Sequence, residues 1–580
     1  MLKKSQLFNL DKKFSINLFG VQKLFWIKII PTHTLKKYLL KKMTYHHKIN
    51  ILSLFLIALF GFEHAIAQEI ITHISVNAEG ENGNSHSQAP ALSADGRYIA
   101  FHSDANNLVP NDNNGFADIF VYDRILKQIN RISVNSEGNE GNFVSFFPNL
   151  SANGRYVTFQ SDASNLVPND DNLKTTDIFV YDRETKATQI VSVSNKGKQG
   201  NSTSSEPDIS ADGRYIAFHS YATNLVSKDS NNRVDVFLHD LETGETIRVS
   251  IKGNSVQAKG ASFSAAISAD GSYIAFTSEA TNLVTDDKNQ KTDILVRDWK
   301  NKETVRISIN NNGEEGDGDS FDASMSADGR YIAFGSRATN LVTNDNNGVE
   351  DIFVHDRQMG ETSRVSINSQ GQQAESASFS PTLSTDGRYV VFNSEADNLV
   401  DDDDNETTDV FIHDRQTGQT RRLSLASQFY ADSSAASYSP AISENGRWVV
   451  FESRAWNLAS NDFNEASDIF LYDRSYYASF DVTTEELYIP VVNVPEVGLF
   501  KARLTLVPNS TPLQLTVNRV NSFRIPLADI PSIYTPDIRL LQLPSVELIN
   551  PPFDTILCQV DMVADIDISV LTVIQLNCNQ

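Results

Sequence analysis

A nine-residue phrase recurs seven times in this chain at an almost constant interval. Its first copy spans residues 93–101 and reads S-A-D-G-R-Y-I-A-F. Its glycine stands at Gly96, Gly154, Gly213, Gly271, Gly329, Gly387 and Gly446. The intervals are 58 or 59 residues. A fixed period of this length indicates a repeat architecture, in which each repeat is one supersecondary unit that packs against its neighbours.

Each repeat holds four strand signals. In the first repeat we expect strands over residues 91–93, 97–103, 118–124 and 129–135. The second and third are nearly continuous apolar runs rich in β-branched and aromatic residues, which is typical of strands covered on both faces. The blades of a β-propeller have that cover, because each blade lies between two others.

The repeats also predict how the ring closes. The phrase of the fourth strand first occurs at 71–77 (I-T-H-I-S-V-N), before the first repeat, and last at 421–425, before the seventh. It is absent after Arg474. The first strand therefore has to complete the last blade, which leaves no open sheet edge. The sequence predicts an all-β fold with one seven-bladed β-propeller over residues 68–474.

The phrase S-x-D-G-R-Y-I-A-F, followed by D-I-F-V-Y-D, resembles the WD-like propeller repeat of the TolB type. Proteins with such repeats are mostly exported or periplasmic interaction platforms, and some carry an attached enzyme domain. The resemblance therefore implies an exported binding protein. TolB itself has six blades and an N-terminal α/β domain, so the resemblance concerns the repeats alone and the Tol–Pal partners do not carry over. A propeller by itself does not determine function.

Residues 1–67 are predicted to be a targeting segment. A basic flank precedes an apolar run over 49–62, and the segment ends in A-I-A at Ala67, the spacing of a signal-peptide cleavage site. The run is shorter than the roughly 20 apolar residues of a membrane span; an uncleaved anchor is the alternative. Met43 stands where such a signal begins, so we expect translation to start there; an unusually long n-region is the alternative. We expect a periplasmic or secreted protein without a stable membrane span after cleavage.

The composition changes after Arg474. Residues 475–580 are rich in Pro, Leu, Val and Ile, with strand signals separated by turns. This pattern predicts a small β-sandwich-like C-terminal domain. In an oxidising compartment Cys558 and Cys578 can form a disulfide, which adds on the order of 3 kcal/mol of stability in the chain-entropy model.

Charge and missing motifs exclude several classes of function. The formal net charge is -24, from 49 basic and 73 acidic residues. This sign argues against nucleic-acid binding, which needs Lys and Arg to neutralise phosphates. Two cysteines are too few for a multi-cysteine zinc site or an iron–sulfur cluster. The sequence has no G-x-S-x-G, no H-E-x-x-H and no phosphate-binding glycine loop, so we assign no catalytic residue.

The loops of a blade differ in length between its two ends. Turns between strands one and two, and three and four, lie on one face and are tight, as at Asp95-Gly96. Loops between strands two and three, and between blades, lie on the other face and are long, such as 104–117 and 136–147. We call this second side the long-loop face. Binding usually occurs on loops held by a rigid scaffold, so we expect a ligand there.

A motif D-x-N-x-x-x-D recurs in the loops between strands two and three. Alternating Asp and Asn oxygens can bind calcium, which takes six to eight oxygen ligands. The same residues also hold tight turns by bonding nearby backbone amides. Blades three and four carry Arg233 and Lys291 within the motif, which disfavours a metal there. If the loops bind calcium, the candidate ligands are therefore Asp112, Asn114, Asp118, Asp345, Asn347, Asp351, Asp403, Asn405, Asp409, Asp462, Asn464 and Asp468, and the turn-forming role stays the alternative.

Aromatic residues end most of the blade-to-blade loops, near the expected mouth of the central channel. They are Phe146, Phe263, Phe321, Phe379 and Tyr438. Such a ring can stack on a sugar or hold a peptide. The alternative is that these side chains wedge adjacent blades together, since aromatic residues dominate packing energetics.

Three functions fit these observations. The first is a non-enzymatic, monomeric, exported scaffold that binds a protein or glycan on the long-loop face, with no required cofactor. The second is a glycan-active hydrolase or lyase with acidic residues at the channel mouth. The third is a calcium-dependent adhesion protein.

Overall fold

The computed structural model describes residues 71–474 apart from 171, 173–174, 402, 426–432, 460–461, 463 and 465. It also gives the backbone of strands within 13–26 and 479–578. The predicted signal run, Met43 and the cleavage site lie outside the described residues. In the part of the chain that is described, no helix is long and apolar enough to cross a membrane.

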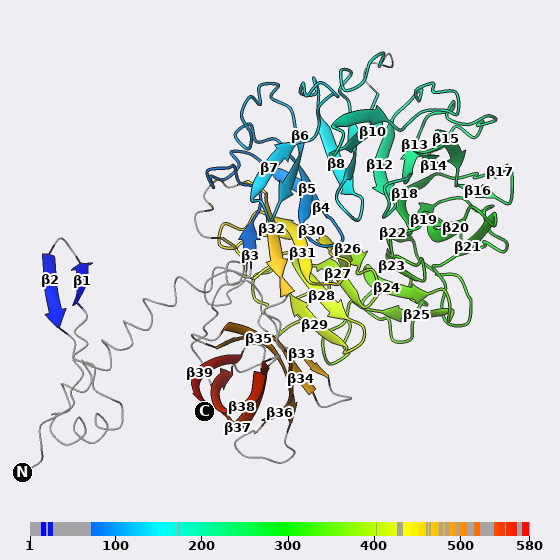
Figure 1. Cartoon of the computed structure of the whole chain (residues 1–580). Helices are drawn as coiled ribbons and strands as arrows, with labels where there is room; N and C mark the ends of the chain where they lie inside the picture. Colours follow the sequence, from blue (N-terminus) through cyan, green and yellow to red (C-terminus); the bar gives the residue numbers. More distant parts are fainter. Residues whose placement is uncertain are drawn as a thin grey trace, which may run out of the picture. The chain divides into compact units, whose positions relative to one another are not determined.

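Seven four-stranded antiparallel sheets surround a central axis (Figure 1). The inner strands are β4 (Ser87–Leu92), β8 (Ser145–Leu150), β12 (Ser204–Ile209), β18 (Ser262–Ile267), β22 (Ser320–Met325), β26 (Ser378–Leu383) and β30 (Ser437–Ile442). The second strands are β5 (Tyr98–Ser103), β9 (Tyr156–Ser161), β13 (Tyr215–Ser220), β19 (Tyr273–Ser278), β23 (Tyr331–Ser336), β27 (Tyr389–Ser394) and β31 (Trp448–Ser453). The third strands are β6 (Asp118–Asp123), β10 (Asp177–Asp182), β14 (Asp235–Asp240), β20 (Asp293–Asp298), β24 (Asp351–Asp356), β28 (Asp409–Asp414) and β32 (Asp468–Asp473). The outer strands are β7 (Gln128–Arg131), β11 (Ala187–Ile190), β15 (Glu245–Arg248), β21 (Glu303–Arg306), β25 (Glu361–Arg364), β29 (Gln419–Arg422) and β3 (Ile71–His73).

The ring closes as the repeats predict. Strand β3, at the start of the described propeller, pairs antiparallel with β32 of the seventh blade, with Ile71 opposite Tyr472. The Ile74 amide continues the pairing by donating to the Ile469 carbonyl at 2.8 Å. The seven-bladed propeller is thereby confirmed, with the seventh blade built from both ends of the repeat region.

The outer strand is shorter than predicted, and a side chain explains why. We expected it to run over 129–135, but β7 ends at Arg131. Two residues later the Ser133 hydroxyl accepts from the Ile119 amide at 3.0 Å and donates to Asp118 Oδ1 at 2.5 Å. The hydroxyl replaces a backbone carbonyl as the acceptor for the Ile119 amide. The outer strand can therefore end at Arg131 while this buried amide keeps a hydrogen-bond partner.

The core lies between the blades. Clusters of buried apolar residues join each second and third strand to the neighbouring blade. In five blades a phenylalanine of strand two stacks on one of strand three, as Phe334 does on Phe353 with ring centroids 5.9 Å apart. These strands are covered on both faces, which accounts for their continuous apolar sequences.

The tight-turn glycine is fixed by the preceding blade. Gly329 has φ +69°, and a β-carbon placed on it would lie 2.7 Å from the Tyr273 ring. The other six turn glycines also have left-handed φ, and each meets a tyrosine or tryptophan ring of the neighbouring blade. Only glycine satisfies both the conformation and the contact, which explains its recurrence.

Further strands lie outside the blades. A short hairpin, β16 (Ile251–Lys252) with β17 (Val256–Gln257), follows blade 3, and β1 (Lys13–Leu18) pairs with β2 (Val21–Trp26). In the C-terminal region one sheet holds β33 (Ser479–Asp481), β34 (Glu486–Val494), β35 (Gly498–Leu506) and β36 (Leu515–Asn521), and another holds β37 (Arg539–Asn550), β38 (Phe553–Ala564) and β39 (Leu571–Cys578). The register pairs Cys558 with Cys578. The C-terminal sandwich and the disulfide stay predictions.

Replacing Gly329 by Ala tests the role of this contact. We expect the free energy of unfolding to fall by about 2–4 kcal/mol, because a left-handed alanine is strained and its methyl group overlaps the Tyr273 ring. Gly348→Ala is the matched control: it has φ +67° but no atom within 4 Å, so only the conformational cost of about 1 kcal/mol remains. Urea unfolding of both variants gives the comparison. Equal losses would contradict the steric account.

Candidate functional site

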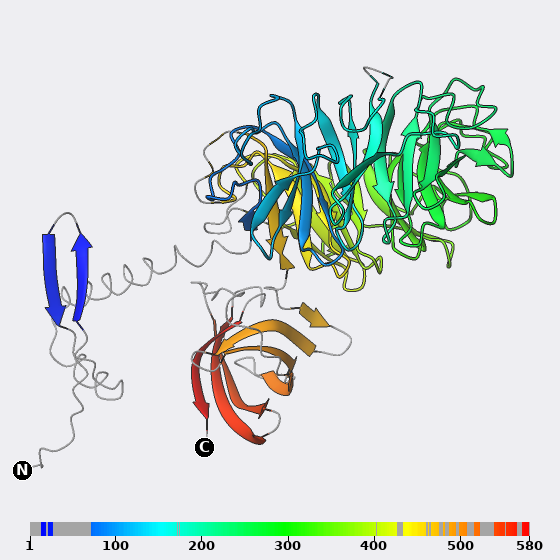
Figure 2. The same cartoon turned by 45° about the horizontal axis from the view of Figure 1, so that its top comes forward.

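The two ends of each blade differ as the sequence predicts (Figure 2). Long loops join strand two to strand three and one blade to the next, whereas tight turns occupy the opposite face. The asparagine of the repeated Asn-Leu pair ties the long loops together. Asn107 Oδ1 accepts from the Asn84 amide at 2.9 Å and its Nδ2 donates to the Asn82 carbonyl at 2.9 Å. The same paired bonds recur in other blades, for example at Asn340.

The D-x-N-x-x-x-D motif forms a pocket of acids that already contains a cation. In blade 1 a guanidinium nitrogen of Arg131 lies 3.4 Å from Asp112, 3.2 Å from Asp118 and 2.7 Å from Glu140. Asn114 donates to Asp118 Oδ2 at 3.3 Å. In each blade we call the residues of the motif, together with the outer-strand residue that faces them, the acid box. In blade 1 the oxygens of Asp112, Asp118 and the adjacent Glu140 lie close enough together to hold a metal, but the guanidinium of Arg131 lies among them.

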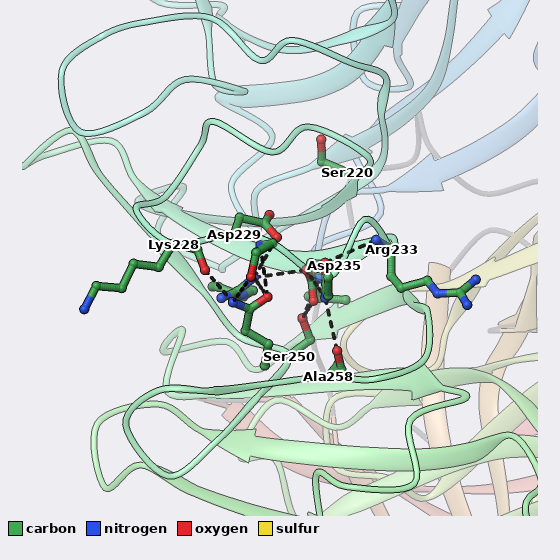
Figure 3. A network of polar contacts seen from close by, with 12 residues as sticks. Ser220, Lys228, Asp229, Arg233, Asp235, Ser250 and Ala258 are labelled. Carbon is green, nitrogen blue, oxygen red and sulfur yellow. Dashed lines mark hydrogen bonds and ion pairs between the residues drawn. The ribbon is translucent and has the colours of Figure 1, made fainter.

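Four further boxes contain an outer-strand arginine. Figure 3 shows the blade 3 box, where Asp229, Asp235 and Ser250 converge; the arginine there is Arg248, 3.0 Å from Asp229. Arg233, which we expected to repel a metal, points away (Figure 3). In the other three boxes the ion pairs are Arg306 with Asp287 and Asp293, Arg364 with Asp345 and Asp351, and Arg422 with Asp403 and Asp409.

Blades 2 and 7 differ at the arginine position. In blade 7 it is His73, whose Nε2 lies 3.1 Å from Asp468 Oδ1, in the box of Asp462 and Asn464. In blade 2 the motif has one extra residue and comprises Asp170, Asn172 and Asp177. The arginine position there is Ile190, which occupies the same register opposite Phe179. Burial, then the nearby charges of Asp170 and Asp162, raises the pKa of Asp177 to about 6.

Burial dominates the electrostatics of the boxes. It raises the pKa of Asp112 to about 6, with a further rise from Asp118 and a reduction from Arg131. Burial likewise raises the pKa of Asp345 to about 6, although Arg364 lowers it. The arginine therefore compensates carboxylates that are costly to keep charged. Calcium binding stays a prediction, and in five boxes a metal would have to displace or share space with a guanidinium.

The five predicted aromatic residues lie at one position of the inner strand, and all are half-buried. In the described part of the chain they are not members of the apolar clusters that join the blades. The Arg337 guanidinium instead lies over the Phe321 ring, 5.3 Å from its centroid. The Phe146 ring makes an edge-to-face contact with the exposed Phe147 ring. The ligand interpretation and the wedge interpretation both stay predictions.

A second ring of residues was not foreseen from the sequence. Each inner strand has a bulge whose residue is left-handed, with φ between 48° and 52°: Ala89, Phe147, Glu206, Ser264, Asp322, Ser380 and Ser439. All seven are non-glycine residues, and six of them, all but Ala89, carry a polar or aromatic side chain at this strained position. Such strain persists only where the surrounding structure imposes it, and it concentrates at functional sites.

The strand-two residue beside each bulge is the variable position of the phrase Y-I-A-F-x-S. It is His102, Gln160, His219, Thr277, Gly335, Asn393 or Glu452. Gln160 Oε1 accepts from the Glu206 amide of the next blade at 2.8 Å, and Glu452 Oε2 accepts from the Ala89 amide at 2.7 Å. In these two blades the side chain therefore reaches the bulge of the following blade. Variation within an otherwise constant repeat was the signal that could have identified the ring.

Acids gather on this ring in blades 3 and 5. Glu206 lies 3.7 Å from the His219 ring, and its Oε2 accepts from Ser264 Oγ at 3.1 Å. Burial, then Glu206, raises the pKa of Asp322. Burial also raises the pKa of Glu350, which pairs with Arg337 at 3.5 Å. The channel mouth thus combines carboxylates, a cation and aromatic rings.

Several solved structures are similar to this chain. An oligogalacturonate lyase in complex with manganese is 13% identical, with a TM-score of 0.42 over 70% of this chain and 92% of that one. A TolB from Agrobacterium tumefaciens is 14% identical, with a TM-score of 0.34 over 61% and 97%. The propeller of the Trilobed protease from Pyrococcus furiosus is 11% identical, with a TM-score of 0.41 over 67% and 93%. No protein-family model and no curated protein sequence matches the chain.

Removing one box arginine tests the charge compensation. Arg364→Gln leaves Asp345 and Asp351 buried without their cation, so we expect a loss of about 3 kcal/mol in unfolding free energy at pH 8. A carboxyl whose folded pKa lies above its unfolded value stabilises the fold when protonated, so the loss should shrink at pH 5. Urea unfolding at both values measures this, with the exposed Lys302→Gln as control. A loss independent of pH would contradict the interpretation.

Calcium itself is tested on the unmodified protein. We expect the same melting temperature in chelator and in millimolar calcium, because arginine occupies five of the seven boxes. A clear rise with calcium would support the calcium prediction and direct attention to blades 2 and 7, where Ile190 and His73 replace the arginine.

Proposed function

We propose that the protein is an exported, non-enzymatic scaffold that holds a glycan or protein ligand at the channel mouth of the long-loop face. The observation that supports this most is the ring of seven left-handed bulge residues. The left-handed backbone conformation is the same in every blade, whereas the residue at this position differs between blades. Varied side chains held on a constant, rigid backbone are what a recognition surface needs.

The aromatic residues supply the apolar part of this surface. Phe321, Phe379 and their equivalents are half-buried and lie one residue before the bulge. Flat aromatic faces stack on sugars or on peptide side chains, and the neighbouring Ser, Glu and Asp side chains provide hydrogen-bond partners. The negative charge of the chain favours neutral or basic ligands.

A glycan-active hydrolase or lyase is the second candidate. It is favoured by Glu206, Asp322 and Glu350, because two of these carboxyls have raised pKa values near the channel. General acid chemistry needs such a carboxyl. Turnover of a polysaccharide that is abolished by Asp322→Asn or Glu350→Gln would establish the enzyme in place of the scaffold.

The scaffold is tested with a double variant, Phe321→Ala with Phe379→Ala. We expect retention on a panel of immobilised polysaccharides, and crosslinking to envelope proteins, to fall about tenfold while the melting temperature changes little. Met359→Ala is the control, since this exposed residue lies in a tight turn on the opposite face. Lost stability with unchanged retention would show that the rings serve packing only.

A further inference from the structure

A pocket of about 300 Å³ lies between blades 2 and 3, on the face of the tight turns. Its lining includes Tyr156 and Asp182 of blade 2, and Asp212, Gly213, Leu241 and the ion pair of Arg214 with Glu242 of blade 3. This is the side opposite the long-loop face, so the pocket is separate from the channel mouth. The other blades show what the fold normally places here.

In five blades the position of Leu241, directly after the third strand, is an arginine. Each of these guanidinium groups lies over an aromatic ring of the preceding blade, 3.9 to 4.5 Å from its centroid. Each also donates a hydrogen bond to the carbonyl of its own blade's turn glycine. The five residues are Arg124, Arg183, Arg357, Arg415 and Arg474.

Blade 4 replaces the arginine with a side chain of similar reach. Trp299 Nε1 donates to the Gly271 carbonyl at 2.7 Å, and its ring tilts against Tyr215 at 5.9 Å. Blade 3 alone has a leucine. Leu241 packs on the apolar cluster between blades 2 and 3, but it has no donor for the Gly213 carbonyl and no charge for the Tyr156 ring. The pocket thus borders the position at which the arginine stands in five other blades.

The charges that surround the arginine in other blades are retained in blade 3. Asp356 and Asp386 act on the charge of Arg415, and their equivalents around the pocket are Asp182 and Asp212. Asp182 already pairs with Arg155 at 2.7 Å. That pair does not preclude a second guanidinium, because Asp356 pairs with Arg330 in the same way beside Arg415.

We propose that this pocket binds a guanidinium group supplied from outside the propeller. Tyr156 offers its ring face, the Gly213 carbonyl offers an acceptor, and Asp182 and Asp212 offer compensating charge. The group is carried either by a free small molecule or by an arginine side chain of a protein segment. We expect a planar guanidinium rather than an ammonium, because in five other blades an arginine guanidinium lies over the aromatic ring that corresponds to Tyr156.

Calorimetry on the full chain tests this with three probes: agmatine, a capped Gly-Arg-Gly peptide and neutral N-butylurea. We expect agmatine to bind with one site per chain and N-butylurea to bind at least about tenfold more weakly. A peptide that binds more tightly than agmatine indicates a protein arginine as the natural occupant. Tighter binding of agmatine indicates a small molecule.

The decisive variant is Leu241→Arg, which copies blades 1, 2, 5, 6 and 7 and fills the pocket from within. We expect it to lose agmatine binding by more than about tenfold and to melt at or above the temperature of the original protein. Leu241→Trp, which copies blade 4, serves if the arginine variant does not fold. In the converse variant, Arg357→Leu, an equivalent pocket opens beside Tyr273 and the stoichiometry should rise to two.

Two results would overturn the proposal. One is agmatine affinity unchanged in both folded Leu241 variants, because filling the pocket must block the site. The other is equal affinity for agmatine and N-butylurea, because charge must then play no part. Neither result bears on the long-loop face, so the scaffold proposal stands or falls separately.

Discussion

The contact between an aromatic ring and the glycine of the next blade's turn is the constraint on which the propeller depends. A ring such as Tyr273 lies so close to Gly329 that no β-carbon fits, and the glycine is left-handed as well. The contact repeats seven times around the ring, so every blade is positioned by its neighbour. Because β3 seals the last blade, the set of contacts has no free end.

Buried charge is the second theme, and it is organised by the repeat. Each acid box places carboxylates where water is excluded, and five boxes provide an arginine from the outer strand. Arginine suits this role because it stays charged and donates to several oxygens at once. An Asp/Asn pattern that resembles a calcium loop can therefore be a buried ion-pair network whose cation is distant in sequence.

The departures from the repeat are as informative as the repeat. At the channel mouth the bulge residues vary while their strained backbone does not, and this concentrates chemical variety on the long-loop face. On the opposite face a single change, Leu241 for arginine, leaves a pocket lined for a guanidinium group. Both candidate sites are found by comparing equivalent positions in the seven blades.

The sequence by itself determined the number of blades, the strand order and the closure, because these depend on periodicity and on the placement of one displaced strand phrase. It also located the aromatic residues, since each follows a long loop. Only the tertiary structure decided what fills the acid boxes, because Arg131 lies on the outer strand and Asp112 in the loop before the third strand, and the pairing of these two strands brings them together. The bulges and the blade 2–3 pocket likewise arise between residues of adjacent blades, whose proximity depends on packing that linear spacing does not express.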